Sequence, residues 1–276
     1  MQIPLSLEPQ GFAGFEKCDK IGVLSQDNRP KLLILMLVNN ETGVIQPVIE
    51  TIKYFKSVFP DIFVHVDGVQ AVGKMPISLK QLGADSFSTS LHKNGGIRGC
   101  SVFFLKKESR KKFNFSPLLL GGGQENGLRS GTENFPAIAA NTYALELVNK
   151  NLDKKLNRLC EFDKKFIDTL LKEIPEAKLN VTIPNKVAGV HSICFQGINA
   201  QSLLLFLDMR NISVSAGSAC HSGSDTPSYV LKAMGLTDEE ALSTLRFSFN
   251  EPLTDKQLKY LIQALKDGIL QQLENE

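Results

Sequence analysis

The sequence predicts an α/β protein with two parts: a larger domain whose mainly parallel sheet is flanked by helices, and a smaller C-terminal domain of α+β type. Apolar runs of strand length alternate with helix-period segments between residues 31 and 105. A long helical pattern then begins at Pro136 and stops before Pro175, and short strands follow it. We therefore expect the larger domain at residues 1–145, and a linking helix with the smaller domain at residues 146–276.

The elements of the larger domain follow from its apolar runs. Residues 1–30 are weakly patterned and suggest only a short strand and a small helix. Lys31 to Val38 reads KLLILMLV, a continuous apolar run that is typical of a strand buried on both faces of a helix-covered sheet. Apolar residues at helical spacing predict a helix from Val48 to Phe59, which Pro60 stops. Further strands are expected at 63–67, 85–90 and 101–105.

The smaller domain is predicted from a mixture of short strands and capped helices. Strands are expected at Val190–Phe195, at Ile212–Ser215 and around Leu245–Phe249. A short helix over residues 227–234 has a proline near its start and a glycine just past its end. Thr237 and Thr254 each precede a Glu or Gln by three residues, which is a capping-box pattern at the start of a helix.

The composition is typical of a globular protein and argues against two classes of partner. The chain has 276 residues, of which 42% are hydrophobic and 22% charged, and its net charge of +2 gives no reason to expect nucleic acid or a membrane as a partner. No apolar run approaches the length of a bilayer, and the N-terminus lacks the layout of a signal peptide. The basic cluster at residues 106–112 is expected to form a solvated helix face.

The five cysteines, Cys18, Cys100, Cys160, Cys194 and Cys220, are scattered along the chain. Their odd number and the lack of a CxxC pattern predict neither a disulfide framework nor a metal site, and they fit a reducing cytoplasm. Cys220 stands apart because glycines and serines flank it, which predicts a mobile polar loop. The alternative for Cys220 is a small buried hydrophobic residue, which is the role we expect for Cys194 within its apolar strand.

Polar groups follow three successive strands of the larger domain: Asn40, Asp67 with Gln70, and Ser90-Leu91-His92-Lys93. In open α/β sheets, ligands bind beyond the carboxyl ends of the strands. A carboxylate at one strand end and a lysine at another suit pyridoxal phosphate, because the lysine forms a Schiff base and the carboxylate keeps the ring nitrogen protonated. Desolvation of Lys93 at the end of a buried strand would favour the neutral amine that a nucleophile requires. Simpler interpretations stay open: a lysine that reaches water, a satisfied core histidine, and turn-forming Asp and Asn residues.

Six motifs occur in order along the chain: VNNETG at 38–43, HVDGVQ at 65–70, SLHK at 90–93, GGGQENGLRSGT at 121–132, SAGSAC at 215–220 and LRFS at 245–248. Together they resemble the cysteine desulfurases of the class V aminotransferase superfamily, which have the PLP-transferase fold type I. The resemblance covers roughly residues 31–265. Six motifs in order with sensible gaps are far more specific than any one of them.

The resemblance implies a pyridoxal 5′-phosphate site. Lys93 matches the Schiff-base lysine, and Asp67 matches the carboxylate on the pyridine nitrogen. Gln70 and Asn40 match groups that contact the ring hydroxyl, and Asn40 also lies near the substrate carboxylate in the family pattern. The cofactor would supply the electron sink for the reaction.

The resemblance also implies a substrate, a sulfur carrier and a homodimer. Ser90 and His92 match phosphate ligands, and Thr132 matches a phosphate ligand that is donated across a homodimer interface. Arg246 matches the bidentate clamp on the carboxylate of the substrate, L-cysteine, a geometry that favours Arg over Lys. Cys220 matches the cysteine that receives the sulfur of the substrate as a persulfide, so that the substrate is released as alanine. The persulfide then passes its sulfur to an acceptor or iron–sulfur scaffold protein.

Two features depart from the family pattern. Family members begin upstream of Met1, so we expect the usual N-terminal segment to be missing, with its Gly-Gly-Thr turn that cradles the phosphate and its histidine that stacks on the ring. Residues 94–99 read NGGIRG, where the family usually has an aromatic residue or His before Gly-Pro-Lys-Gly. Two alternatives therefore stay open: a truncated or split desulfurase that is inactive alone and acts as an interaction protein, and a selenocysteine lyase, which shares nearly all of these motifs.

Overall fold

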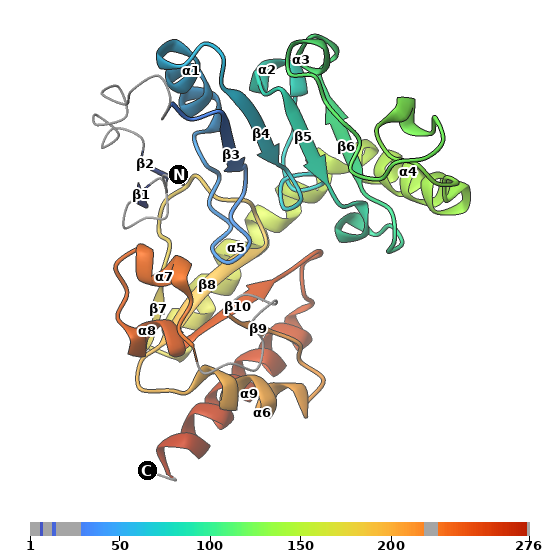
Figure 1. The fold of residues 1–276 in the computed structure, drawn as a ribbon. Coiled ribbons are helices and arrows are strands. Elements are labelled where there is room, and N and C mark those ends of the chain that lie inside the picture. Colours follow the sequence, from blue (N-terminus) through green and yellow to red (C-terminus); the bar gives the residue numbers. More distant parts are fainter. Residues whose placement is uncertain (1–5, 8–12, 15–28, 218–225, 275–276) are drawn as a thin grey trace. The chain divides into compact units, whose positions relative to one another are not determined.

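The computed structural model describes residues 6–7, 13–14, 29–217 and 226–274, which fall into two compact units (Figure 1). The first unit comprises residues 29–37 and 47–152. The second comprises residues 38–46, 153–217 and 226–274, together with the paired short strands β1 (Ser6–Leu7) and β2 (Ala13–Gly14). The compact units divide the chain between Leu152 and Asp153, and the domain limits at residues 145 and 146 stay a prediction.

The first unit is built on a mixed, mainly parallel sheet. Its strands are β3 (Leu32–Met36), β4 (Phe63–Asp67), β5 (Ser86–Thr89) and β6 (Val102–Leu105), in the spatial order β3-β4-β5-β6. β3, β4 and β5 are parallel, and β6 pairs antiparallel with β5. This arrangement confirms the α/β fold class predicted for the larger part of the chain. Because β4 and β5 are adjacent and parallel, their carboxyl ends lie at the same edge of the sheet.

Helices connect and cover these strands. They are α1 (Val48–Val58), α2 (Leu79–Leu82), the 3₁₀ helix η3 (Leu91–Asn94), α3 (Lys107–Lys112), the 3₁₀ helix η4 (Glu125–Gly127) and α4 (Phe135–Lys150). α1 buries Val48, Ile52 and Phe55, which recur at helical spacing on one stripe, as the sequence pattern predicted. α3 exposes its lysines to solvent, which confirms the solvated helix face.

The burial predicted for residues 31–38 is only half right. Leu33 and Leu35 are buried, whereas Leu32 and Ile34 are 53% and 63% exposed. Successive strand residues point to opposite faces of a sheet, so β3 has one buried face and one open face within the part of the chain that the structure describes. The continuous apolar run therefore predicted the strand correctly but not the cover on its second face.

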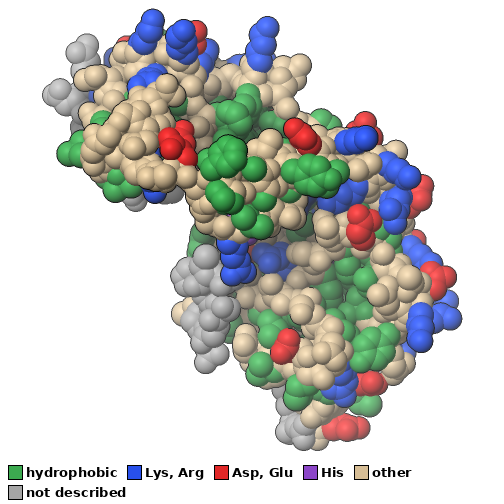
Figure 2. Space-filling view, turned by 90° about the vertical axis from the view of Figure 1, so that its right-hand side faces the viewer, with side chains coloured by type: hydrophobic (Ala, Val, Ile, Leu, Met, Phe, Trp, Pro, Cys, Tyr) green, Lys and Arg blue, Asp and Glu red, His purple; other side chains and the backbone are tan. Residues whose placement is uncertain are grey.

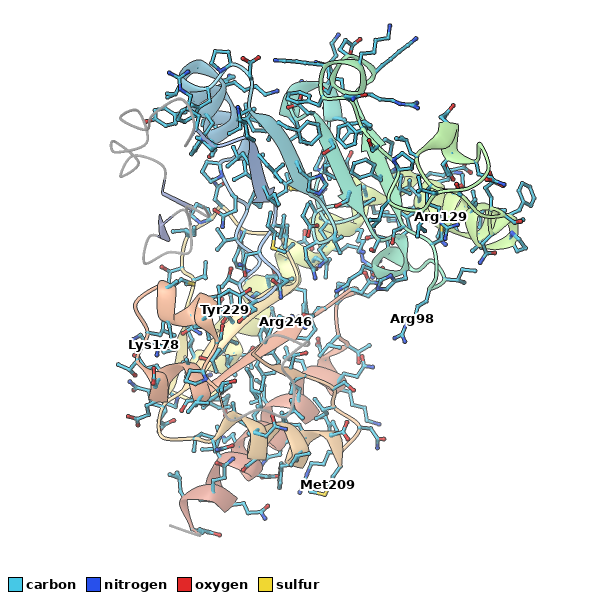
Figure 3. All side chains as sticks on the ribbon, viewed as in Figure 1. Arg98, Arg129, Lys178, Met209, Tyr229 and Arg246 are labelled. Atoms are coloured by element: carbon cyan, nitrogen blue, oxygen red, sulfur yellow. The ribbon has the colours of Figure 1, made fainter. Side chains whose placement is uncertain are left out.

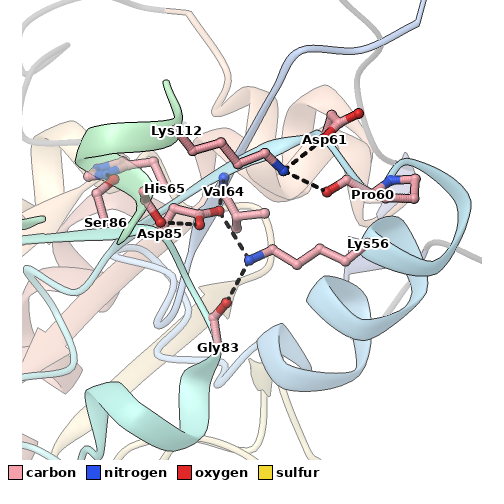
Figure 4. A network of polar contacts seen from close by, with 10 residues as sticks. Lys56, Pro60, Asp61, Val64, His65, Gly83, Asp85, Ser86 and Lys112 are labelled. Atoms are coloured by element: carbon pink, nitrogen blue, oxygen red, sulfur yellow. Dashed lines mark hydrogen bonds and ion pairs between the residues drawn. The ribbon is translucent and has the colours of Figure 1, made fainter. Parts of the chain in front are cut away.

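A buried carboxylate ties the elements of the first unit together at the end of the sheet opposite to the carboxyl ends of β4 and β5 (Figure 4). Asp85, directly before β5, accepts hydrogen bonds from the backbone N–H of Val64 in β4 at 2.9 Å and from the hydroxyl of Ser109 in α3 at 2.6 Å. The ammonium group of Lys56 in α1 lies 3.1 Å from the same carboxylate. One side chain thus joins β4, β5, α1 and α3.

The second unit contains an antiparallel sheet packed against long helices. The strands are β7 (Ala177–Leu179), β8 (Val190–Phe195), β9 (Ser215–Ala216) and β10 (Thr244–Ser248), in the order β7-β8-β10-β9. The helices are α5 (Leu152–Glu173), α6 (Ala200–Asp208), α7 (Tyr229–Ala233), α8 (Asp238–Leu242) and α9 (Asp255–Leu273). Side chains of α5, α6, α9, β8 and β10 form one core, which includes Phe166, Ile193, Leu203, Leu245 and Leu265. This confirms a smaller α+β part.

Most elements predicted from residue 136 onward are present, with three differences. Both capping boxes, at Thr237 and Thr254, are formed. The single long helix is instead two, α4 and α5, because Asn151 leaves helical geometry with φ −111° and ψ 6° and caps α4 with its backbone N–H. The strand expected at 212–215 is only β9 at Ser215–Ala216, and β7 was not predicted.

Candidate cofactor and substrate site

The first group of candidate residues lies where β4 and β5 end. Asp67 is the last residue of β4, and its register partner in β5 is Ser88. The turn that carries Ser90, His92 and Lys93 follows β5 directly. The parallel pairing of the two strands therefore brings the predicted carboxylate and the predicted lysine turn to one edge of the sheet.

One of the two carboxylate oxygens of Asp67 accepts a hydrogen bond from the neighbouring backbone. The Oδ1 atom accepts the backbone N–H of Val69 at 2.8 Å, while Oδ2 makes no hydrogen bond to any residue that the structure describes. Gly68 donates its N–H to Ser88 O at 2.8 Å, and a Cβ atom at this position would lie 1.8 Å from the ring of Phe87. Only glycine can make this close approach, so the turn at the end of β4 is fixed against β5.

Gln70 and His65 complete the polar surroundings of Asp67. Gln70 lies in the same turn and accepts a hydrogen bond from Lys74 Nζ at 2.6 Å. His65 stands two residues before Asp67, on the same face of β4. Its ring nitrogens lie 2.8 Å from Ser86 Oγ and 3.2 Å from Ser88 Oγ. Burial lowers the pKa of His65, and the nearby carboxylate of Asp67 opposes this shift. Sequence reasoning assigned His65 no role beyond its place in the strand.

The lysine turn is a 3₁₀ helix that leaves its basic side chains in solvent. Ser90 precedes the helix, and its Oγ lies 3.1 Å from Ser101 Oγ. His92 and Lys93 are both exposed. The expectation that Lys93 is desolvated at the end of the strand is therefore wrong for this structure. The reason is geometric: the chain turns at Leu91, which is buried, and the next two side chains point outward. The alternative, a lysine that reaches water, describes Lys93 here.

Thr132 is exposed in the segment between η4 and α4. It precedes Asn134, whose side chain accepts the N–H of Ala137 and caps the first turn of α4. No hydrogen bond joins Thr132 to another residue within the described segments. The predicted role across a homodimer interface stays a prediction.

The second group of candidate residues lies in the second unit and centres on Arg246 of β10, labelled in Figure 3. Its Nη1 donates to the backbone carbonyl of Asn40 at 2.8 Å, and its Nη2 donates to Ser215 Oγ at 3.0 Å. Its Nε is buried and has no partner in the described part of the chain. Burial lowers the pKa of Arg246, which the carboxylate of Glu41 opposes. The guanidinium thus keeps donor capacity for an anionic ligand.

Asn40 enters this group through its backbone rather than its side chain. The amide of the preceding Asn39 shapes the turn, since its Oδ1 accepts the N–H groups of Glu41 and Thr42 at 2.9 and 3.0 Å. Glu41 is buried, and one of its oxygens accepts the hydroxyl of Ser228. Sequence reasoning did not single out Glu41 or Ser215 as neighbours of Arg246, because contacts across such sequence distances leave no local signal.

The predicted sulfur carrier, Cys220, lies outside the described residues. Of the other cysteines, Cys194 is buried in β8, where burial raises the pKa of its thiol, as expected for a structural residue. Cys160 is exposed and Cys100 is half-buried.

Residues 14–261 match the family described as aminotransferase class-V, which is most of the chain. The chain belongs to this family. Within it, the chain is 35% identical to cysteine desulfurase IscS of Dictyoglomus turgidum, over 94% of this chain and 68% of the relative. It is also 35% identical to cysteine desulfurase IscS of Methanosarcina thermophila, over 98% of this chain and 67% of the relative. Among solved structures, a NifS-like protein of Rickettsia africae has 31% identity and a TM-score of 0.82, over 96% of this chain and 69% of that one.

This class-V aminotransferase family member spans about two thirds of the length of these relatives. The family match confirms the resemblance inferred from the six motifs. Pyridoxal phosphate is the cofactor of this family. The residues at the ends of β4 and β5 fit that group chemically: Asp67 has an unengaged oxygen for a protonated ring nitrogen, Lys93 offers an amine, and Ser90 offers a hydroxyl. No helix within the described segments is long and apolar enough to cross a membrane.

Proposed function

We propose that this protein is a cysteine desulfurase: it removes sulfur from L-cysteine, releases alanine, and holds the sulfur as a persulfide on Cys220. The observation that carries the proposal is the meeting of Asp67 and the Ser90–Lys93 turn at the carboxyl ends of two adjacent parallel strands. The names of relatives at 35% identity support the choice of reaction within the family.

The residues of the first unit would hold the cofactor. Asp67 would accept the proton of the ring nitrogen through Oδ2, and Gln70 would face the ring hydroxyl. Ser90 and His92 would bind the phosphate, and Lys93 would attach the group covalently. When bound, pyridoxal phosphate supplies an electron sink for the pair of electrons left on the substrate α-carbon. Lys93 would also carry the proton that leaves the α-carbon, because a lysine amine can act as a general base.

Arg246 would bind the carboxylate of the substrate. Its two terminal nitrogens are fixed by hydrogen bonds to Asn40 O and Ser215 Oγ, which sets the plane of the guanidinium before any ligand arrives. The unpartnered, buried Nε supports a role as an additional donor. A pre-oriented guanidinium loses little side-chain entropy on binding, which favours a bidentate contact with a carboxylate.

Cys220 would take the sulfur atom in a balanced step. Its thiolate attacks the sulfur of the substrate cysteine, so that an S–S bond forms while the bond between sulfur and the β-carbon breaks. The sulfur is oxidised to the sulfane level, the carbon is reduced, and a proton completes the methyl group of alanine. The flanking glycines and serines of Cys220 support a loop able to pass the persulfide to an acceptor, such as an iron–sulfur scaffold protein.

The proposed assembly is a homodimer in the cytoplasm. Large apolar side chains are exposed in the first unit, including Leu118 at 93%, Leu120 at 83%, Phe135 at 74% and Tyr143 at 63%. Figure 2 shows hydrophobic side chains gathered on the face turned toward the viewer. Large apolar side chains that gather on one exposed face often mark a protein interface. Thr132 stands between Leu120 and Phe135 in the sequence. This position supports the proposed contribution of Thr132 to the site of a second copy bound on this surface.

The test is to follow absorbance of the purified full chain with pyridoxal 5′-phosphate, before and after L-cysteine, and to assay sulfide and alanine in parallel under reductant. Cys220→Ser should bind the cofactor and change its spectrum with L-cysteine, yet release no sulfide. Cys160→Ser, which alters an exposed cysteine on α5, serves as the matched control and should retain the parent rate. Sulfide release by Cys220→Ser at the parent rate would contradict the assignment of Cys220. A parent chain that yields no sulfide and no alanine would contradict the proposed activity.

A further inference from the structure

α4 packs against both turns that carry the candidate cofactor ligands of the first unit. A Cβ atom on Gly73, which follows the Asp67–Gln70 turn, would lie 2.9 Å from Val148 Cγ1 of α4 and 2.4 Å from Asn94 Oδ1 of the lysine turn. The segment that follows the Asp67–Gln70 turn therefore lies close to the lysine turn and to the same helix.

The segment that follows the lysine turn is contacted by Asn141, a buried polar residue inside α4. Its side chain is only 1% exposed, and its Nδ2 donates to Ala137 O within the helix at 2.8 Å and to Ile97 O at 3.2 Å. A Cβ atom on Gly96 would lie 2.0 Å from its Oδ1. Asparagine is a poor helix former, and burial of an amide is costly unless it is hydrogen-bonded. An apolar residue would suit this position better if filling space were its whole purpose.

The segment that Asn141 holds has little stiffness of its own. Gly95 and Gly99 both have positive φ, at 84° and 90°, and Gly96 lies between them. Glycine in such positions costs conformational entropy on folding and imposes no preference between alternatives. The segment closes onto the lysine helix because Gly95 and Gly96 both donate their N–H groups to Leu91 O. Among the residues described, Asn141 provides the one side-chain hydrogen bond to the backbone of residues 95–99.

We propose that Asn141 is a positioning residue for Lys93. Its amide fixes Ile97 and Gly96, these fix the hydrogen bonds to Leu91 O, and the closed turn sets the direction in which the 3₁₀ helix presents Lys93. The inference rests on the proposed function, because it takes Lys93 as the lysine that attaches the cofactor. It adds a residue of α4 to that site which touches neither cofactor nor substrate.

The test measures where pyridoxal 5′-phosphate attaches, rather than turnover. The full chain is incubated with the cofactor, reduced with borohydride and digested, and the labelled fraction of Lys93 is compared by mass spectrometry with that of Lys111, an exposed lysine of α3. Asn141→Leu, which keeps the volume but removes the amide, should lower the Lys93-to-Lys111 ratio about tenfold or more, since small displacements at a reacting group have large effects. Hydrogen exchange at residues 91–99 should become faster in the same variant.

Two controls separate positioning from folding. Thr142→Val alters the next residue of α4 and should leave the labelling ratio unchanged. Its exposed hydroxyl donates to Ile138 O within the helix, and no other bond of this hydroxyl is found among the described residues. Gly96→Ala, which pushes the turn away from an intact Asn141, should lower the ratio as Asn141→Leu does, and decides the question if Asn141→Leu does not fold. A folded Asn141→Leu with the parent ratio, or loss of folding in both variants, would overturn the proposal. A parent chain that labels Lys93 no better than Lys111 would instead overturn the proposed function.

Discussion

The carboxylate of Asp85 should contribute more to stability than any other ion-paired group in the first unit, and a graded pair of substitutions can measure this. The side chain is buried and accepts from Val64 N, Ser109 Oγ and Lys56 Nζ. In Asp85→Asn, the amide can turn its NH₂ toward Ser109, whose hydroxyl can accept, and keep its oxygen for Val64. The loss is then mainly that of the charge, about 1–2 kcal/mol.

Asp85→Ala removes every acceptor and should cost more. The N–H of Val64 is left buried without a partner, which costs about 1–3 kcal/mol, and the charge-assisted bonds from Ser109 and Lys56 are lost as well. Lys56 also donates to Gly83 O and reaches solvent, so its share is small. The sum is about 3–4 kcal/mol. A difference of about 1.4 kcal/mol is a factor of ten in an equilibrium constant, so local opening of β4 and β5 should rise by about two to three orders of magnitude.

Hydrogen exchange followed by mass spectrometry tests this within the first unit. Peptides from β4 and β5 should exchange faster in the order parent, Asp85→Asn, Asp85→Ala, while peptides from β8 in the second unit stay unchanged. Asp61→Asn is the matched control, because Asp61 pairs with Lys112 at 2.8 Å but is 88% exposed, and such surface pairs contribute about 0–1 kcal/mol (Figure 4). Equal protection of the β4 and β5 peptides from exchange in Asp85→Ala and in Asp61→Asn would refute the predicted role of Asp85.

The same network predicts a pH dependence with a definite sign. Burial alone would raise the pKa of Asp85, but the hydrogen bonds from Ser109 and Val64 and the contact with Lys56 outweigh it and hold the pKa below its ordinary value. A carboxylate with a depressed folded-state pKa stabilises the fold above its unfolded value of about 3.9, and this contribution is lost as the pH falls through the folded value. The difference in stability between parent and Asp85→Asn should therefore shrink in acid.

Three further predictions concern single positions. Burial outweighs the hydrogen bond to Asp163 and lowers the pKa of His191, so the unfolding temperature should fall as the pH drops below the unfolded value of about 6.5, and His191→Leu should lose that part of the pH dependence. Gly68→Ala should cost about 1–3 kcal/mol in urea unfolding because its Cβ collides with the ring of Phe87, and Phe87→Leu in the same chain should recover part of the loss. Arg246→Lys should raise the KM for L-cysteine about tenfold or more, with a smaller effect on kcat, since an ammonium cannot reproduce the planar fork; an unchanged KM would count against the clamp.

The fold could be predicted to a large extent because its strands and caps are locally encoded. β4 was predicted with the limits that the structure has, and the capping boxes at Thr237 and Thr254 mark the helix starts. The break at Asn151 could not be found this way, since apolar residues continue at helical spacing on both sides of it. The open face of β3 also could not be predicted, because a run of apolar residues does not say what covers each face.

For the candidate site, too, some features could be predicted from local sequence and others could not. The chemical groups were predictable, since a lysine, a carboxylate and an arginine stand in recognisable motifs at strand ends. What holds these groups was not, because the supporting contacts join distant residues or use the backbone. Arg246 donates to the backbone carbonyl oxygen of Asn40 and not to the Asn40 side chain. A contact with the backbone cannot be read from the identity of the residue.

Asn141 shows how these hidden supports can still be recognised once a structure is known. A buried asparagine within a helix violates local preference, and natural chains tend to keep such violations where function requires them. Gly96, which faces it across the contact, violates preference in the opposite way, because it lacks the side chain that would stiffen the turn. Each is unfavourable alone, and together they place an amide against a backbone carbonyl beside the candidate lysine. A coupled pair of locally poor choices is therefore a more specific indication of a positioning role than either residue by itself, and a double-mutant cycle between the two positions would measure that coupling directly.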